Sequence, residues 1–247
     1  QAGGAGGART PGAARQVGDA PVARIYGGLS MLGHDYTMEG NGKGTTPAEA
    51  SYLNGNLFKG KVGGAPSLLA GGIVRLGKAP VMLEAEGSAW LETVAVAGEE
   101  YANTGVQARI GARYYAPLGS SPAYWYAMGG FLHTPALAFI YGDETRTSVD
   151  LQNYALNGAR LGGGLGVDAG RFWGEFDAGL TWGAWFLPQV VAPRLILGFD
   201  VKPGMMVFLS YSYEARFIRV KLPAHGGILN VNDTYQPIVL GIGGAFG

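Results

Sequence analysis

The chain has 247 residues; hydrophobic residues make up 47% of it, charged residues only 15%, and 44 residues are glycine. Soluble proteins usually carry about 25% charged residues, so little of this surface is suited to water. Basic and acidic residues number 18 each, which gives no net charge. Nucleic acid is therefore not an expected partner, because nucleic-acid-binding proteins show a basic excess. The absence of cysteine excludes disulfides, thiolate metal sites and a cysteine nucleophile.

The beginning of the chain is interpreted as a mature N-terminus. No run of about 18 apolar residues occurs, so the sequence predicts no transmembrane helix. Gln1 is not preceded by a charged and then apolar leader, which we interpret as the result of signal-peptide cleavage. Residues 1–20 are rich in glycine and alanine with nothing to bury, and we expect a disordered periplasmic tail.

From residue 21 onward, apolar and polar residues alternate with a period of two, which is typical of β-strands. Val81, Leu83 and Ala85 share one face, for example, whereas Glu84 and Glu86 lie on the other. Turn signals divide the chain into about ten strands, although eight or twelve remain open alternatives. The predicted strands are 22–32, 67–77, 80–97, 104–116, 123–141, 156–169, 171–187, 190–200, 204–220 and 235–246.

The connections between these strands differ in length. Tight turns are expected at 77–80, 117–122, 169–170 and 202–204, whereas the other connections are mostly longer, and the longest is 33–66. Short periplasmic turns alternating with longer external loops are typical of outer-membrane barrels. An even number of strands then places both termini on the periplasmic side.

The last strand has an apolar face that ends in an aromatic residue. A closed barrel needs this strand to pair with the first one, 22–32. We interpret Phe246, which is followed only by Gly247, as the signal for barrel insertion. The other residues of this apolar face are Ile238, Leu240, Ile242 and Gly244.

Period two alone does not say which face is inside, and a soluble barrel would bury the apolar face. Aromatic residues near the strand ends favour the inverted, transmembrane arrangement, because such residues form girdles at membrane interfaces. The predicted girdles are Tyr114, Tyr124, Tyr126, Phe186, Tyr213 and Phe217. The polar face mixes glycine with charges of both signs, as a narrow lumen requires. The predicted lumen charge network is Glu84, Glu86, Arg109, Arg113, Arg160, Asp168, Glu175, Asp177, Arg194, Asp200, Glu214 and Arg216.

With these features, residues 22–247 resemble the small outer-membrane β-barrels of Gram-negative bacteria that have eight to ten strands. The resemblance is to a class and carries no specific family signature. It implies an all-β, closed, antiparallel, up-and-down transmembrane barrel that spans residues 21–247. It also implies contact with outer-membrane lipid and lipopolysaccharide, and with the barrel assembly machinery during insertion.

The expected function is non-enzymatic. Interior side chains fill the narrowest barrels, so we expect the charge network to plug the lumen and satisfy its own polar groups. The sequence then favours a structural or anchoring component of a cell-envelope assembly for adhesion, motility, secretion or surface structure, with proteins of that assembly as partners. A narrow, porin-like pore for ions or small solutes is the alternative.

An outer-membrane hydrolase of the protease or lipid deacylase type is the second alternative. His34 stands beside Asp35, His225 lies near Asp233, and a His–Asp pair can activate water or a serine. His133 is the third histidine. No motif identifies a nucleophile, and no metal-ligand spacing occurs, so we expect no catalytic residue, no metal and no cofactor. The glycine-rich run 161–166 lacks the residues of a phosphate-binding loop and predicts a strand with small residues toward a crowded lumen.

Overall fold

The computed structural model describes residues 23–42, 55–96, 99–141, 149–183, 187–222 and 227–246. All of the regular structure in these ranges is β-strand. These ranges contain no helix that is long and apolar enough to cross a membrane. The strands are β1 (Ala23–Gly42), β2 (Gly55–Arg75), β3 (Val81–Val96), β4 (Glu99–Pro117), β5 (Ala123–Tyr141), β6 (Val149–Ala169), β7 (Phe172–Trp182), β8 (Val190–Lys202), β9 (Met205–Ser212), β10 (Glu214–Leu222) and β11 (Gly227–Phe246).

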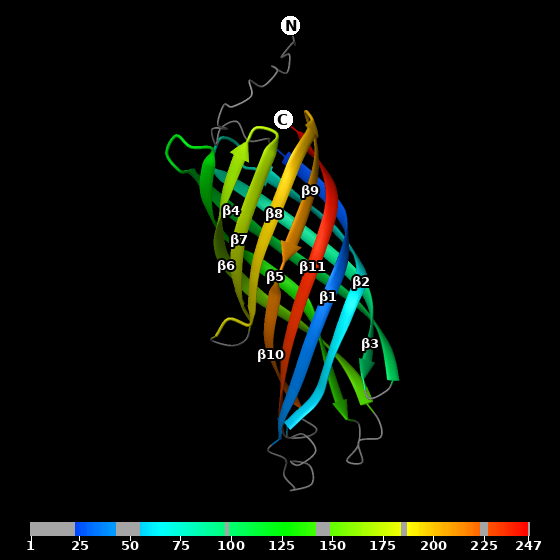
Figure 1. Ribbon diagram of the computed structural model, residues 1–247. Helices are drawn as coiled ribbons and strands as arrows, with labels where there is room; N and C mark the ends of the chain where they lie inside the picture. Colours follow the sequence, from blue (N-terminus) through cyan, green and yellow to red (C-terminus); the bar gives the residue numbers. More distant parts are fainter. Residues whose placement is uncertain are drawn as a thin grey trace.

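The strands form one closed antiparallel barrel (Figure 1). Each strand from β1 to β8 pairs with the next, β9 and β10 together occupy the place between β8 and β11, and β11 pairs with β1. The eleven segments therefore fill ten positions around the ring. This confirms the predicted all-β, closed, up-and-down barrel of ten strands.

The division between β9 and β10 lies at Tyr213, where two prolines flank the strand. Pro193 lies in β8, and Pro237 lies in β11 between the residues that pair with Tyr211 and Glu214. Proline has no N–H to donate to a ladder, so regular pairing is interrupted here. The Tyr213 N–H still donates to the Pro193 carbonyl at 3.0 Å, and the ring stays closed.

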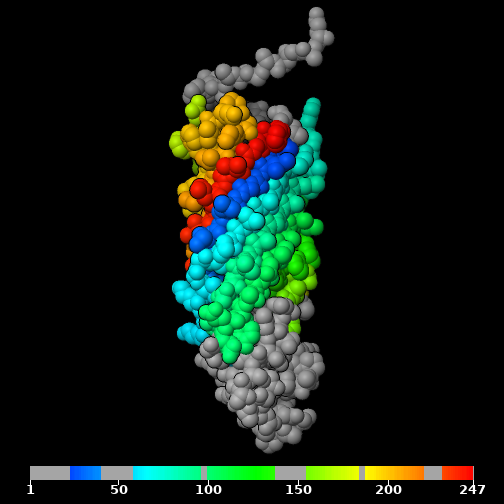
Figure 2. All heavy atoms as spheres, turned by 90° about the vertical axis from the view of Figure 1, so that its right-hand side faces the viewer, coloured from blue at the N-terminus to red at the C-terminus, as the bar shows by residue number. Residues whose placement is uncertain are grey.

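Closure between β1 and β11 follows the prediction and extends beyond it. The register runs from Ala23 opposite Phe246 to Gly42 opposite Gly227 without a shift. The pairing of 22–32 with 235–246 is confirmed as the turn-side half of this ladder. Figure 2 shows β11, β1, β2 and β3 side by side, running obliquely over one face of the barrel.

The four tight turns are confirmed, and each contains one glycine with positive φ. The φ values are 59° at Gly77, 63° at Gly119, 81° at Gly170 and 79° at Gly204. This left-handed region is readily open to glycine and costs other residues energy. The turns lie at the same end of the barrel as Ala23 and Phe246, so both ends of the described chain are on the turn side (Figure 1).

The predicted long loop 33–66 is wrong. β1 continues to Gly42 and β2 begins at Gly55, and they pair beyond Leu32 with a register shift before His34. The prediction failed because the apolar residues of β1 change faces. They lie on the outward face up to Met31 and on the inward face beyond it. Residues 43–54 and the predicted tail 1–20 lie outside the described residues.

The turn-side half of the barrel has an apolar outer surface, which we call the lipid belt. It extends from the turns to Met31 on β1 and Ile238 on β11. Large apolar side chains are exposed around the whole ring, as expected for a surface that contacts lipid. They include Ile25, Leu29, Leu68, Val74, Leu83, Leu91, Val106, Ile110, Phe131, Leu161, Leu165, Phe172, Phe176, Leu195, Leu197, Leu209, Leu240 and Ile242.

The strands continue beyond the lipid belt with the opposite polarity, and we call this part the loop-side extension. It comprises residues 33–42, 55–66, 92–96, 99–104, 132–141, 149–158, 218–222 and 227–236. Its described outward residues are mostly polar, among them Asp35, Thr37, Glu39, Lys59, Lys61, Thr93, Asn157, Arg219, Asn232 and Thr234. The barrel's hydrophobic core lies inside the extension and at its border with the lipid belt. It is formed by Leu32, Tyr36, Met38, Phe58, Val62, Ala65, Trp90, Val94, Leu132, Ala136, Leu156, Val190, Ile218, Val231 and Tyr235.

Candidate functional site in the barrel lumen

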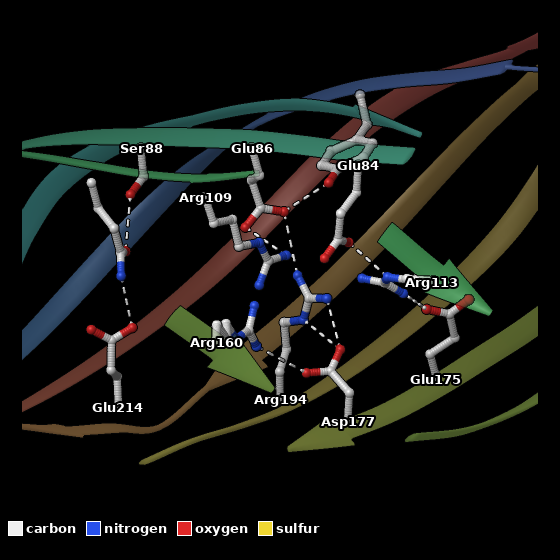
Figure 3. Close-up of polar contacts among 12 residues, drawn as sticks. Glu84, Glu86, Ser88, Arg109, Arg113, Arg160, Glu175, Asp177, Arg194 and Glu214 are labelled. Atoms are coloured by element: carbon white, nitrogen blue, oxygen red, sulfur yellow. Dashed lines mark hydrogen bonds and ion pairs between the residues drawn. The ribbon is translucent and has the colours of Figure 1, made fainter. Parts of the chain in front are cut away.

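A cluster of charged side chains fills the lumen at the level of the lipid belt (Figure 3). The period of two places Glu84 and Glu86 on the inner face of β3, and Arg109 and Arg113 on that of β4. Glu86 and Arg109 are direct partners in the β3–β4 ladder, and Arg109 Nη2 lies 2.7 Å from Glu86 Oε1. Local strand geometry therefore creates this first pair, because neighbours in register have their side chains close together.

Arg194 connects opposite walls of the barrel. From β8 it donates to Asp177 of the neighbouring β7 at 2.7 Å and to Glu86 of β3 at 3.3 Å. Strands β3 and β8 are five positions apart in the ring of ten, so the Glu86–Arg194–Asp177 bridge crosses the lumen. Both Arg194 and Asp177 are buried, and Figure 3 shows the Arg194 guanidinium between the two carboxylates.

Arg113 connects β4 to two acids on different strands. Its Nε donates to Glu84 on β3 at 2.6 Å, and its Nη1 donates to Glu175 on β7 at 3.0 Å. The guanidinium also lies 4.9 Å from the centre of the Tyr126 ring. A fully buried arginine needs such partners, because an unpaired buried charge is very costly.

A second contact across the diameter joins β4 to β10. Gln107 Nε2 donates to Glu214 at 2.8 Å, and Glu214 accepts a 2.6 Å hydrogen bond from Arg216 Nε. Arg216 also donates to the Pro135 carbonyl of β5 at 2.6 Å. These contacts lie at the base of the hydrophobic core, so polar bridges and apolar packing follow one another along the lumen.

Tyrosine hydroxyls complete the network, and two of these tyrosines show that part of the girdle prediction is wrong. Tyr124 donates to Glu175 at 2.7 Å and Tyr126 to Asp177 at 3.2 Å, so these two rings point into the lumen and not toward lipid. Tyr26 donates to Glu86 at 2.8 Å. The rings of Tyr126 and Tyr124 fit because Gly164 and Gly166 of the neighbouring β6 leave the space that a Cβ atom would occupy. This confirms the small residues expected in 161–166.

The remaining girdle residues have different outcomes. Tyr114, Tyr213 and Phe217 are exposed on the outer surface, as the girdle prediction requires. Phe186 lies outside the described residues. The error for Tyr124 and Tyr126 arose because aromatic rings serve both at a membrane interface and as hydrogen-bond donors inside a lumen.

Ten of the twelve predicted network residues take part in the lumen contacts described above and the Arg160–Asp177 pair at 3.7 Å. Asp168 and Asp200 instead lie at the turn-side ends of β6 and β8, in register with Trp173 and Met206. The sequence identified the charged residues from their shared face. It gave no signal for which acid meets which arginine, because partners on opposite walls are separated by as many as 108 positions.

A second buried polar cluster lies in the loop-side extension. His34 Nδ1 is 2.9 Å from a Glu92 oxygen, and His34 Nε2 is 3.8 Å from Asp233 Oδ1; all three side chains are fully buried. Glu92 also accepts a 2.6 Å hydrogen bond from Asn103. The His34 ring stacks on Tyr235 with a centroid distance of 4.0 Å.

This arrangement corrects the histidine pairs considered from the sequence. Asp35 does not pair with His34, because adjacent strand residues point to opposite faces; it lies on the outer surface, 3.6 Å from Lys61. His225 lies outside the described residues. His133 lies on the outward face of β5, with Nδ1 2.8 Å from Asn157 Oδ1.

In the described part of the chain, no group of three or more His, Cys, Asp and Glu side chains is arranged to hold a metal ion. A cavity of about 120 Å³ lies in the lumen beside the charged bridges. Sites for drug-sized ligands usually measure about 300–1,000 Å³. The interior of the lipid belt is therefore a packed polar network with a small internal space.

No protein-family model and no characterised relative matches the sequence. Among solved structures, the outer membrane protease OmpT from Escherichia coli is similar, with a TM-score of 0.57 and 10% identity over 91% of this chain and 96% of OmpT. The translocator domain of the autotransporter NalP from Neisseria meningitidis gives 0.42 with 12% identity over 91% and 88% of the two chains. Neisserial surface protein A gives 0.33 with 10% identity over 90% and 97%.

The similarity to OmpT establishes the fold and leaves the activity open. Together with the lipid belt, it defines the class: the protein is an outer-membrane β-barrel protein.

Proposed function

We propose that this protein is a sealed, non-enzymatic barrel that serves as a structural or anchoring component of an envelope assembly. The observation that supports this role best is the closure of the lumen by contacts between opposite walls. Glu86 and Arg194 join β3 to β8, and Gln107 and Glu214 join β4 to β10. We infer that side chains that meet across the full diameter block the path for solutes at that level.

The proposed orientation places the turns and both termini in the periplasm. The loop-side extension then stands outside the lipid, where it contacts lipopolysaccharide and presents the loops to the exterior. Its polar outer surface and apolar interior suit this position, because the extension is packed like a soluble β-barrel. Partners of the envelope assembly bind the loops, the rim or the N-terminal tail.

The histidine cluster supports a non-enzymatic role over the hydrolase alternative. The side chains of His34, Glu92 and Asp233 are fully buried, and Trp90 and Tyr235 of the hydrophobic core lie around them. A general base must reach its substrate directly or through one water molecule. We therefore assign His34 to the packing of the extension.

Planar-bilayer recording tests the sealed barrel against the narrow pore. We expect the purified protein to give no reproducible unit conductance steps. The double variant Arg194→Ala and Gln107→Ala, which removes both contacts across the lumen, is expected to conduct, and Lys59→Ala on the outer surface is the matched control. Unit steps from the unmodified protein would establish the pore instead.

Crosslinking in the native membrane tests the anchoring role. After mild crosslinking and purification in detergent, we expect defined envelope proteins to be recovered with the barrel in constant proportion. The same preparation is to be assayed against a peptide and lipopolysaccharide panel. Recovery of the barrel alone, or hydrolysis that His34→Gln abolishes in a folded protein, contradicts the proposal.

A further inference from the structure

The lumen cavity has a lining that is rich in arginine. Six arginines line it, against three glutamates, and the rest of the lining includes apolar side chains such as Ile73 and Phe208. The arginines are Arg24, Arg109, Arg113, Arg160, Arg194 and Arg216, and the glutamates are Glu86, Glu175 and Glu214. An interior surface of this kind favours anionic or hydrogen-bond-accepting contents.

The unsatisfied groups of the lining agree with its charge. Among the described side chains that line the cavity, buried atoms without a hydrogen-bond partner occur on Ser30, Arg109 and Trp173. Arg109 Nε and Trp173 Nε1 only donate, and the Ser30 hydroxyl donates as well as accepts. Buried polar groups are nearly always satisfied, so these donors indicate a missing acceptor inside the cavity.

The positive excess is concentrated at one place. The carboxylates of Glu86 and Asp177 are shared by three guanidinium groups, those of Arg109, Arg160 and Arg194. Figure 3 shows the three groups converging between the two acids. One positive charge is thus left without a counter-charge, in a region where each of the five side chains is at most 13% exposed.

The neighbouring charges do not remove this excess. Glu84 and Glu175 are both bound by Arg113, which leaves one negative charge. The Arg24 guanidinium lies over the Trp173 ring at 5.5 Å, and Trp173 is two positions from Glu175 on the same face of β7. The excess is therefore a local one, in which three guanidinium groups share the carboxylates of Glu86 and Asp177.

Of the three arginines in this group, Arg160 has the longest ion pair. Its ion pair with Asp177 is 3.7 Å long, whereas charge-assisted hydrogen bonds usually measure about 2.7–2.9 Å. The side chain is 93% buried, being 7% exposed, and Gly179 of β7 leaves the space in which the guanidinium packs. Arg109 Nε has no hydrogen-bond partner, so an acceptor placed between Arg109 and Arg160 would meet donors from both guanidinium groups.

We propose that the lumen cavity binds a small inorganic anion, a halide or an oxyanion such as phosphate, between Arg109 and Arg160. The anion balances the unmatched charge and accepts hydrogen bonds from both guanidinium groups. A cavity of about 120 Å³ admits such an ion with a few water molecules, each of which takes up about 30 Å³. Gluconate, a larger organic anion, serves as the reference.

Thermal unfolding in detergent tests this site at constant ionic strength, with gluconate replaced stepwise by chloride, bromide or phosphate. We expect a saturable rise in Tm of about 5–10 °C at an anion concentration of about 100 times Kd. A rise with chloride and bromide identifies a halide site, and a rise with phosphate alone identifies an oxyanion site. Equal Tm values in all four anions would overturn the proposal.

Arg160→Gln removes the unmatched charge and should weaken the anion dependence at least tenfold, whereas Arg219→Gln on the outer surface should leave it unchanged. An unaltered dependence in Arg160→Gln contradicts the site. Should this variant not fold, bromide-soaked crystals of the unmodified protein decide: we expect an anomalous peak between Arg109 and Arg160. If only phosphate raises Tm, phosphate-soaked crystals take the place of the bromide soak, and phosphate density is expected at the same position. The absence of bound anion there in both soaks contradicts the proposal. Both tests detect the anion whether the barrel is sealed or conducts.

Discussion

The lipid belt and the loop-side extension use the same strands with opposite polarity. Along β11, Ile238, Leu240 and Ile242 point outward in the belt, whereas Asn232 and Thr234 point outward in the extension. Inside, the order is reversed, with an ion-pair network in the belt and a hydrophobic core in the extension. The change occurs within a few residues and without a break in the β1–β11 ladder.

This comparison shows that the backbone ladder is common to both regions, while the surrounding solvent selects the side chains. In lipid every backbone polar group must be satisfied internally, and closure of the ring achieves this. In water the apolar interior provides the burial that stabilises a soluble barrel. The extension is therefore expected to raise the loops on a rigid support, whose stability comes from packing and not from the membrane.

The largest effect is expected from the buried histidine of the extension. His34→Ala leaves the carboxylates of Glu92 and Asp233 buried without their shared partner. Breaking a buried pair in this way costs about 3–5 kcal/mol. Urea unfolding in detergent should show this loss, whereas His133→Ala, at an outward-facing histidine, should change the free energy of unfolding by no more than about 0.5 kcal/mol. Similar losses for both variants would argue against a packing role for His34.

A lysine scan along the outer face of β11 tests the boundary between the two regions. Leu240→Lys places a charge in the lipid belt, where it costs about 2–4 kcal/mol near the midplane. Thr234→Lys places the same side chain on the extension, where water solvates it, and a change of about 0.5 kcal/mol or less is expected. Refolding into lipid vesicles followed by urea titration measures both. Equal costs at the two positions would show that the boundary is misplaced.

The sequence was sufficient to predict the closed ring and the inward and outward faces of its strands in the lipid belt. Alternation with a period of two, the turn glycines and the apolar closing strand rest on local backbone geometry, which neighbouring residues determine. The ends of β3 and β5 beyond the belt agree with the predicted strands 80–97 and 123–141. On β1, β2 and β11 they were missed, because apolar residues there occupy the inward face, as at Tyr36 and Met38. Partners such as Arg194 and Glu86 depend on the strand number and stagger of the closed barrel, which local patterns do not specify.

A tyrosine inside the lumen tests whether the polar network stabilises the belt. Tyr126→Phe removes the hydroxyl that donates to Asp177 at 3.2 Å and leaves the ring in place. Hydrogen bonds to charged groups contribute about 1.5–3 kcal/mol, and Arg194 still holds this carboxylate, so the lower end of that range is expected. Tyr114→Phe, on the outer surface, is the control for urea unfolding. A loss no larger than that of the control would show that the ion pairs alone satisfy Asp177.

The smallest effect is expected at the ion pair on the outer surface of the extension. Lys61 and Asp35 lie 3.6 Å apart, and their side chains are 76% and 41% exposed. Exposed pairs of this kind contribute about 0–1 kcal/mol, and salt screens them. Lys61→Met should therefore alter the urea midpoint little at low salt and not measurably at about 0.5 M salt. A loss that persists at high salt would mean that water does not reach this surface, and that the lipid belt extends beyond Met31.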